Sequence, residues 1–359
     1  MPVPDLEQLK RVIAVAATAV SGDNSQPWKF LWDGCRLQIN CDPARDHFAY
    51  DADSESVLIS FGALLENLSL ALGREGFGME VELLPKGKPV SQVAVVSMCA
   101  GGESRDPLAG CAAARCVNRR MYSRRPVPQD QARQLIQAVE QNEDVRVSWV
   151  EDRRSIAGFA DLVSRADRMI WEHPGLFGDL RRWLRIGPNA GESRDGMPLR
   201  VLGLGFPERL MMTWLDSFEA VLRLNRLGFS RIAAFKSRRW VLNSGAVAVF
   251  TIRRTEPTDF IAAGRCLQRF WIKANALGVA VQPMSAWVFL LNHLRVNGAK
   301  DFSAAQRDKI TAIKQSFEAL MPELAGEEPI MFLRLGYAPP PPFRTLRLPV
   351  EDVLEVKLS

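Results

Sequence analysis

Apolar residues recur along this chain in two patterns, one with the spacing of a helix and one with the compactness of a strand. The helical spacing predicts helices over 6–20, 57–74, 129–141, 155–185, 208–227, 260–277 and 304–320. Runs rich in β-branched and aromatic residues predict strands over 28–32, 36–40, 79–84, 92–99, 145–150, 241–252, 279–282 and 330–335. We expect a further helix to end in the arginine-rich stretch 115–125, and the Gly- and Pro-rich stretch 187–207 to be a long loop.

The composition is that of a folded globular protein. Of 359 residues, 47% are hydrophobic and 24% charged, which excludes a disordered or low-complexity chain. The longest apolar stretch, 241–252, is too short to cross a bilayer core of ~30 Å. The N-terminal segment has no basic segment of the signal-peptide kind ahead of its apolar run and no clear cleavage site. We therefore expect a cytoplasmic protein without a membrane partner.

Several common chemistries have no motif in this sequence. The six cysteines form no CxxC pair, the three histidines are isolated, and no GxSxG elbow is present. A disulfide framework, a zinc site and a Ser-His-Asp hydrolase are therefore not expected. The stretch 203–205 lacks the third glycine of a dinucleotide-binding fingerprint, and there is no P-loop. We expect neither a metal site nor a catalytic side-chain triad.

The net charge of +5 leaves two classes of partner open, nucleic acid and anionic small ligands. Nucleic-acid binding requires basic residues interleaved with aromatic ones along one face. Only the stretch 230–240 has this composition, and we interpret it as the solvated face of a helix. An anionic small molecule is therefore the expected partner, and nucleic acid is not.

Three polar clusters are candidates for binding such an anion. The turn 21–28, with the sequence SGDNSQPW, offers backbone N–H groups and short side chains to a polar ligand, although a turn that only leads into a strand has the same composition. The stretch 118–125 contains four arginines in seven residues, which either bind a phosphate or form a solvated basic corner. Arg344 and Arg347 follow a proline-rich spacer, and they either hold the same anion or belong to a solvated tail.

A weak internal repeat relates two helical stretches. Gly62 and Gly76 bound the first stretch, and Gly264 and Gly278 bound the second with the same spacing. Each leads into a predicted strand that ends in proline. The repeat indicates a duplication.

Together these motifs resemble the nitroreductase family of flavoproteins. The resemblance rests on Asn-Ser-Gln-Pro-Trp at 24–28, on Arg120 and Arg124, on the glycine-bounded helix 264–278, and on Leu-Gly-Tyr at 335–337 followed by Arg344 and Arg347. It covers roughly residues 10–355, with an unmatched middle at about 150–235. In that family two subunits of an α+β fold share FMN sites at their interface. The resemblance therefore implies an α+β, nitroreductase-like fold.

The order of the motifs departs from that of an ordinary family subunit. No basic segment precedes Asn24, and no second Asn-Ser-Gln-Pro-Trp follows Arg124. This resembles the fused Acg-type members, in which one chain imitates the dimer and keeps one flavin site. It implies two related halves, 1–110 and 111–359, that form a pseudo-dimer, as a monomer or a homodimer. A helical insertion at about 151–235 would either cover the flavin as a lid or pack as a peripheral layer.

The resemblance also implies roles for single residues. Arg120 and Arg347, helped by Arg344, would hold the FMN phosphate, and Arg124 would lie near the pyrimidine edge of the flavin. The other cofactor-binding residues that it implies are Ser21, Gly22, Asn24 and Gln26 in the first half, and Gln282, Pro283, Ser285 and Ala286, near flavin N5, in the second. The family often has an acidic residue and a glycine where Ser285 and Ala286 stand.

The implied function is an FMN-dependent oxidoreductase with NADH or NADPH as electron donor. It would transfer hydride through flavin N5 to or from a small organic substrate, with the chemistry supplied by the flavin rather than by a catalytic side chain. The alternative, from another class, is an Acg-like protein that binds or sequesters FMN without turnover. Such a protein would fill the space over the flavin with bulky residues of the middle segment, for which the candidates are Trp171, Phe177, Trp183, Phe206 and Trp214.

Overall fold

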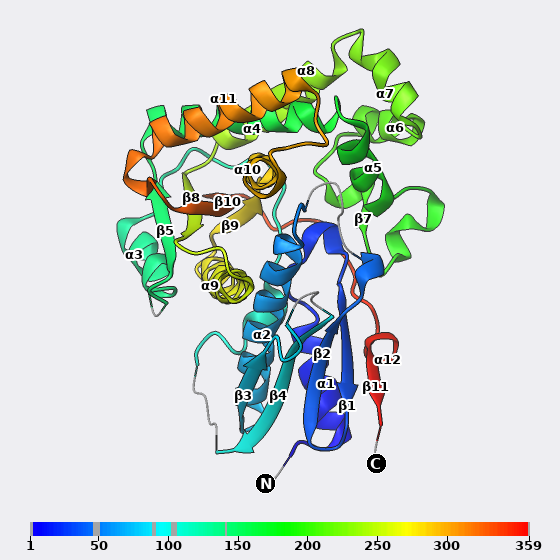
Figure 1. Ribbon diagram of the computed structural model, residues 1–359, viewed down its shortest axis with the longest axis vertical. Coiled ribbons are helices and arrows are strands. Elements are labelled where there is room, and N and C mark those ends of the chain that lie inside the picture. Colours follow the sequence, from blue (N-terminus) through cyan, green and yellow to red (C-terminus); the bar gives the residue numbers. More distant parts are fainter. Residues whose placement is uncertain (1–2, 46–50, 88–90, 102–105, 141, 358–359) are drawn as a thin grey trace.

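The computed structural model describes residues 3–45, 51–87, 91–101, 106–140 and 142–357. Two larger sheets lie at the centre, with helices between them and on their outer faces (Figure 1). The predicted α+β class is confirmed.

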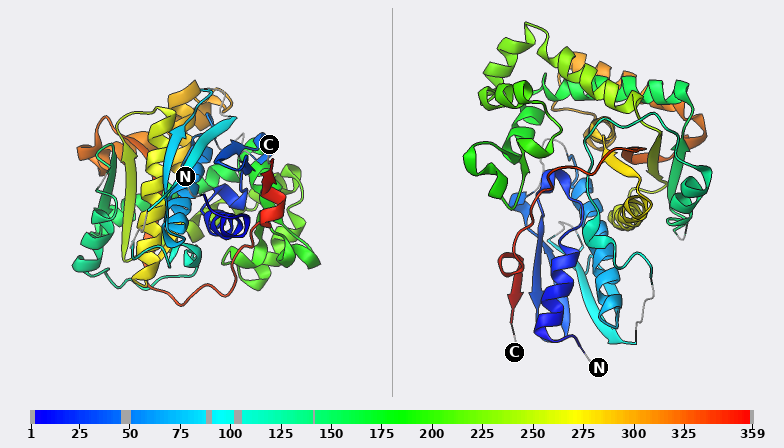
Figure 2. Two further views of the ribbon diagram at one scale, coloured as in Figure 1. Left: turned by 90° about the horizontal axis from the view of Figure 1, so that it is seen from below. Right: turned by 180° about the vertical axis from the view of Figure 1, so that it is seen from behind.

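The first sheet has five strands in the order β11-β1-β2-β4-β3. Their bounds are β1 (Trp28–Trp32), β2 (Arg36–Cys41), β3 (Phe77–Leu83), β4 (Gln92–Ala100) and β11 (Leu354–Val356). The first four pair antiparallel, whereas β11 runs parallel to β1, with Leu354 opposite Phe30. The C-terminal strand therefore lies in the sheet of the first half, beside β1 (Figure 2).

The second sheet is antiparallel, in the order β5-β8-β10-β9. Its strands are β5 (Val145–Val150), β8 (Ala246–Ile252), β9 (Ala280–Pro283) and β10 (Glu328–Gly336). Every residue of β8 is buried, because this inner strand has both faces covered. This explains why all its residues except Thr251 are apolar. A small parallel pair joins β6 (Leu184–Arg185) to β7 (Met197–Pro198).

The α-helices begin and end at signals that the sequence carries. Their bounds are α1 (Leu6–Ala16), α2 (Glu55–Arg74), α3 (Gln129–Gln137), α4 (Arg153–Ile170), α5 (Pro174–Trp183), α6 (Phe206–Trp214), α7 (Phe218–Asn225), α8 (Phe229–Leu242), α9 (Pro257–Ala276), α10 (Ala286–Asn297), α11 (Ala304–Leu320) and α12 (Val350–Val353). Capping boxes start α1, with Asp5 and Gln8, and α11, with Ser303 and Gln306.

Helices α2 and α9 pack against each other and join the two sheets into one core. A Cβ on Gly62 would lie 2.0 Å from the carbonyl oxygen of Ile261, and a Cβ on Gly264 would lie 2.0 Å from that of Ile59. Only glycine permits such a close approach of two backbones. The core continues from β1 and β2 through these helices to β8 and β10.

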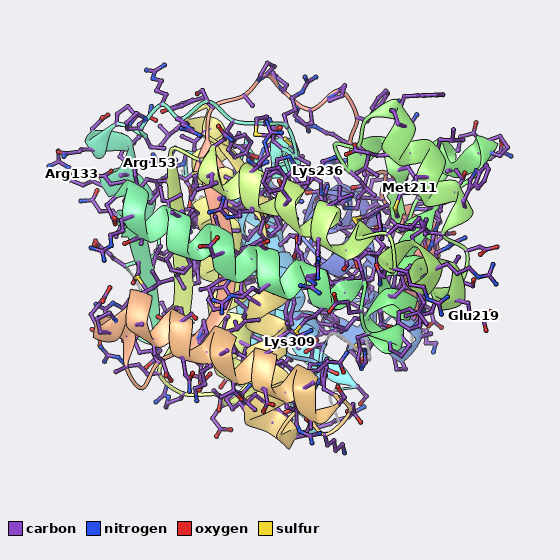
Figure 3. The ribbon with its side chains drawn as sticks, turned by 90° about the horizontal axis from the view of Figure 1, so that it is seen from above. Arg133, Arg153, Met211, Glu219, Lys236 and Lys309 are labelled. Atoms are coloured by element: carbon purple, nitrogen blue, oxygen red, sulfur yellow. The ribbon has the colours of Figure 1, made fainter. Side chains whose placement is uncertain are left out.

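A second core covers the other face of the second sheet. It contains α4, α10 and α11, with the Trp287 ring tilted against Phe159 and Phe317 and edge-on to Phe332. Helices α4, α8 and α11 lie side by side in this layer (Figure 3).

Residues 171–228, here called the cover segment, pack around a small core of their own. Its buried members include Phe177, Leu184, Met197, Met212 and Val221. The stretch 187–207, expected to be one loop, contains β7 and two short 3-10 turns, Pro188–Glu192 and Leu199–Val201.

Several predicted elements need correction. Residues 115–125 form no helix: a short 3-10 turn, Ala112–Ala114, precedes them, and the chain from 115 to 125 is irregular. The stretch 155–185 is two helices, broken where Pro174 begins α5. The stretch 241–252 is the end of α8 followed by β8, and α10 has no counterpart among the predicted elements.

One described helix, α2, is long and apolar enough to cross a membrane. The expectation that no stretch has this length is therefore wrong for 55–74. However, 89% of the most apolar 18 residues of α2 are buried inside the protein, as in the core helix of a globular fold.

Candidate functional site

A cavity of about 320 Å³ lies between segments of the two halves. Its walls are residues of the turn 18–24, the start of α2, the segment 113–119, the start of α10 and the tail 343–347. Met197 and Val201 of the cover segment close one side. Of the predicted cofactor-binding residues, those that line the cavity are Ser21, Gly22, Asn24, Pro283, Ser285, Arg344 and Arg347.

The turn 21–28 has a strained backbone that its own side chains hold in place. Asp23, Asn24 and Gln26 have φ values of 46°, 61° and 52°. Such conformations cost about 1–3 kcal/mol each and occur where surrounding contacts enforce them, often at functional sites. Here the Ser21 hydroxyl accepts a hydrogen bond from the Gln26 N–H at 3.1 Å.

The two amide side chains of this turn tie it to distant segments. Nδ2 of Asn24 donates to the carbonyls of Gly196 and Leu346, both at 3.1 Å. Nε2 of Gln26 donates to the carbonyl of Arg194 at 2.8 Å, and its Oε1 accepts from the Leu348 N–H at 2.9 Å. Gln26 is fully buried and does not line the cavity, so it stabilises the turn rather than contacting a ligand.

Arg115 is the most unusual group in the cavity wall. It is 6% exposed, its Nη2 donates to the carbonyl of Thr18 at 2.9 Å, and its Nε and Nη1 have no partner. The guanidinium lies 4.9 Å from the ring centroid of Trp271. Burial, together with the charges of Arg347 and Arg344, lowers the pKa of Arg115 to about 9. A buried cation with unused donors is costly unless an anion accepts from it.

Arg119 lines the cavity four residues further on. Its Nη1 donates to the carbonyl of Val201 at 3.4 Å, and burial lowers its pKa while the charge of Asp23 opposes the shift. A Cβ on Gly203, whose φ is 67°, would lie 2.5 Å from the carbonyl oxygen of Arg119. The cover segment therefore rests directly on this backbone.

Arg344 and Arg347 differ in how far their donors are used. Arg344 lines the cavity with an exposed side chain. Arg347 donates to Oδ1 of Asn24 at 2.7 Å and to the carbonyl of Ala17 at 3.1 Å, just past the end of α1. Burial lowers its pKa to about 10. Arg347 thus anchors the tail to α1 as well as lining the cavity.

The structure does not bring Arg120 and Arg124 to the cavity. Both are exposed, and Nε of Arg124 donates to Oδ1 of Asn243 at 3.1 Å. The prediction rested on the spacing of the family's basic segment, but in this chain the stretch is irregular and both side chains are exposed. Arg115 and Arg119 are four residues apart, as Arg120 and Arg124 are, and they stand five residues earlier in the sequence. This spacing is the sequence signal by which Arg115 and Arg119 could have been found.

Arg334 is fully buried next to the site and had no signal in the sequence beyond its place in an apolar strand. Its guanidinium lies 3.7 Å from the ring centroid of Tyr122 and donates to the carbonyl of Arg120 at 2.7 Å. Nε and Nη2 both donate to Oε1 of Gln282, at 2.9 and 2.7 Å. Gln282 is thereby held outside the cavity wall, contrary to its predicted role. Burial lowers the pKa of Arg334 to about 10.

Pro283, the last residue of β9, and Ser285, the N-cap of α10, line the cavity, but Ala286 does not. The Ser285 hydroxyl accepts from the Phe332 N–H at 2.9 Å and donates to the Phe332 carbonyl at 3.2 Å. The first N–H groups of a helix have no acceptor within it, so this end of α10 offers donors to a ligand. Among the described residues, no group of three or more His, Cys, Asp or Glu is placed to hold a metal ion.

No protein-family model matches the chain. It is 26% identical over 335 residues to an uncharacterized protein of Mycobacterium tuberculosis, a match that covers 92% of this chain and 46% of that protein. It is 28% identical over 127 residues to the "Putative NAD(P)H nitroreductase" of two strains of the same species, covering 35% of this chain and 37% of that protein. The chain thus aligns with less than half the length of these curated relatives.

Two solved structures show the range of the structural neighbours. The FMN-dependent nitroreductase NfnB of Mycobacterium smegmatis, in complex with NADPH, has a TM-score of 0.38 at 13% identity, covering 69% of this chain and 98% of that one. A nitroreductase structure from Anabaena variabilis has a TM-score of 0.49 at 10% identity, covering 94% and 90%. The sequence similarity to two proteins named "Putative NAD(P)H nitroreductase" confirms the predicted resemblance to the nitroreductase family.

Proposed function

We propose that this protein is an FMN-dependent oxidoreductase of the nitroreductase type. The observation that carries the proposal is Arg115, a buried guanidinium whose Nε and Nη1 have no protein partner at a cavity that Arg119, Arg344 and Arg347 also line. A phosphate monoester has the charge and the acceptor oxygens that such a group requires. The residues present therefore fit the phosphate end of FMN.

Arg115 and Arg119 would take the phosphate-binding role that the resemblance implied for Arg120, together with Arg347 and Arg344 of the tail. The resemblance placed Arg124 near the pyrimidine edge of the flavin, and this residue also lies outside the cavity wall. Ser21, Gly22 and Asn24 line the same cavity from the first half. Ser285 presents the first turn of α10 to it. When bound, FMN would supply the redox chemistry, which needs no catalytic side chain.

The expectation of one flavin site per chain rests on a pseudo-dimeric arrangement. The reciprocal contact of Gly62 with Ile261 and of Gly264 with Ile59 supports it, because residues at equivalent positions contact each other in the way that a two-fold axis relates two subunits. The parallel pairing of β11 with β1 modifies the proposed halves, since 354–356 complete the first sheet.

The composition of the cavity wall favours turnover over storage of FMN. In turnover, NADH or NADPH would be the electron donor and a small organic molecule the acceptor. None of the five bulky residues expected to fill the space lines the cavity. Phe177 belongs to the core of the cover segment, and Trp171 packs against it. Trp183 is buried with the guanidinium groups of Arg182 and Arg185 over its ring, and Phe206 and Trp214 are exposed. The cover segment contributes only Met197 and Val201 to the wall. A cytoplasmic location stays part of this proposal.

Flavin binding tests the proposal directly. We expect the purified protein to bind about one FMN per chain, and Arg115→Ala to weaken FMN by roughly ten- to a hundred-fold while riboflavin changes far less. Arg120→Ala is the matched control, because this exposed arginine lies five residues further on and outside the cavity. Equal losses for FMN and riboflavin, or an effect of Arg120→Ala equal to that of Arg115→Ala, would contradict the phosphate assignment.

Redox competence is a separate measurement. Anaerobic mixing with NADH or NADPH should bleach the bound flavin, and an oxidised acceptor should restore its absorbance. The storage alternative would be favoured if dithionite bleaches the bound flavin, whereas NADH, NADPH and a panel of small organic donors all fail to bleach it.

A further inference from the structure

Three consecutive helices expose an unusual amount of apolar surface, here called the outer apolar face. Its exposed apolar residues are Phe206, Leu210 and Trp214 on α6, Leu222 on α7, Leu227 after it, and Ile232 and Phe235 on α8. They include the most exposed large hydrophobic side chains of the described chain, with Leu227 at 81%, Trp214 at 74% and Phe206 at 71%. Scattered single exposures are normal in a folded protein, but a gathering of this size marks an interaction surface.

The exposure follows helical geometry. Phe206, Leu210 and Trp214 are spaced by four residues, so they form one stripe along α6. Ile232 and Phe235 form a second stripe on α8, and the ion pair of Lys236 with Glu208, at 2.6 Å, joins the two helices. Met211 on α6, Glu219 on α7 and Lys236 on α8 lie on the side of the molecule seen in Figure 3.

The same helices carry most of the excess positive charge of the chain. Residues 206–239 contain seven arginines and lysines against three aspartates and glutamates, a net +4 of the +5 of the whole chain. In the described part of the chain, no carboxylate lies within ion-pair distance of the arginines at 209, 223, 226, 231 and 239. A partner that complements this face must be apolar and negatively charged.

We propose that the outer apolar face docks onto an anionic phospholipid surface. Interfacial helices combine Trp, Phe and Leu on one face with flanking basic residues, which pair with lipid headgroups while the apolar side chains enter the acyl boundary. Such docking needs no membrane-spanning segment. The expectation that the protein has no membrane partner rested on the length of its apolar stretches, and that length does not bear on docking at a surface.

Other occupants fit the face less well. A single-stranded nucleic acid would use Phe206, Trp214 and Phe235 for stacking, but the four aliphatic residues would gain nothing from bases. A second copy bound through the same face would place unpaired arginines against each other. The lipid surface uses both the aliphatic and the cationic side chains.

Vesicle sedimentation of the full chain tests the proposal. We expect binding to phosphatidylcholine vesicles that contain phosphatidylglycerol, weak binding to phosphatidylcholine alone, and loss of binding at high salt. Phe206→Ser with Trp214→Ser should weaken binding by roughly ten- to a hundred-fold, because both side chains leave the acyl boundary. Arg223→Gln with Arg226→Gln should weaken it by about five-fold for each arginine.

The controls are changes of the same type elsewhere on the surface. Leu6→Ser, at an exposed leucine of α1, and Arg133→Gln, at an exposed arginine of α3 far from Met211 in Figure 3, should leave vesicle binding unchanged. Circular dichroism checks that the face variants remain folded, as expected for exposed positions. The proposal is overturned if these controls weaken binding as much as the face variants. It is equally overturned if the native chain does not bind anionic vesicles but self-associates or binds oligonucleotides, and the face variants abolish that other interaction.

Discussion

Gly62 and Gly264 occupy equivalent positions in a reciprocal contact: each lies against a backbone carbonyl three residues before the other. The glycine spacing in the sequence had suggested that the two helices are related. The structure shows what the glycines do, which is to let α2 and α9 approach until no side chain fits between them.

Replacing Gly62 by Ala should therefore destabilise the fold. The new Cβ would meet the Ile261 carbonyl oxygen at 2.0 Å and the Gly264 Cα at 2.8 Å, so the helices must separate. We expect a loss of about 1–3 kcal/mol or more in the free energy of unfolding, measured with urea. Gly178→Ala in α5 is the control, because nothing lies within 4 Å of its Cβ position. That change should stabilise by about 0.5–1 kcal/mol through helix propensity, and a similar loss in both variants would refute the packing argument.

Arg334→Met should weaken FMN binding although Arg334 does not line the cavity. Without the guanidinium, Oε1 of Gln282 and the carbonyl of Arg120 lose buried donors, at about 1–3 kcal/mol each. We expect lower stability in urea and weaker FMN binding, because Arg334 positions the segment that follows Arg119. Arg238→Met removes only a surface ion pair with Asp161 and should cost about 1 kcal/mol or less.

Asn24→Gly should loosen the cover segment. Glycine accepts the φ of 61° at this position, so the change removes the side-chain hydrogen bonds to Gly196, Leu346 and Arg347 without adding strain. We expect trypsin to cleave after Arg194 and Arg200 about ten-fold faster, because local opening becomes less costly. Cleavage after Arg133 serves as the internal reference, and a parallel rise there would indicate global rather than local opening.

The depressed pKa of Arg115 predicts a pH dependence with a definite sign. Its folded pKa of about 9 lies well below the ordinary pKa of an arginine, so above pH 9 the unfolded chain binds more protons and the stability of the cofactor-free protein rises with pH. FMN binding has the opposite trend. The affinity should be flat below pH 8 and fall by up to ten-fold for each pH unit above about 9, as the guanidinium loses its charge.

Titration of FMN by fluorescence between pH 7 and 10 measures this effect. Arg347 has a pKa of about 10, so the fall near pH 9 reports Arg115 first. Arg115→Ala should remove that part of the profile, and a profile unchanged by this substitution would place the titrating group elsewhere.

The sequence predicted several strands well because their signals are local. The strand 28–32 was found at its observed bounds, as was 145–150, since alternation, turn residues and chain breaks are all read from neighbouring positions. The turn 21–28 was likewise recognised as part of the site, although only long-range contacts reveal that Gln26 stabilises the turn rather than contacting a ligand.

The basic residues of the site were harder to predict because charge alone does not say which way a side chain points. Arg120 and Arg124 were chosen because their spacing resembles that of the family's basic segment, whereas the irregular chain places Arg115 and Arg119 in the cavity wall. Arg334 gave no warning, since a cation in an apolar strand becomes meaningful only when Tyr122 and Gln282 are seen beside it.

The hydrogen bond between Asn24 and Arg347 spans 323 residues of sequence. During synthesis on the ribosome, the turn that carries Asn24 emerges early, but the tail that supplies Arg344, Arg347 and β11 follows all the other strands. The cavity wall is therefore incomplete until the tail has been translated and has paired with β1. Cofactor capture by this chain should therefore be a late event that follows translation of the tail, and a nascent chain that lacks residues 344–356 should not hold flavin.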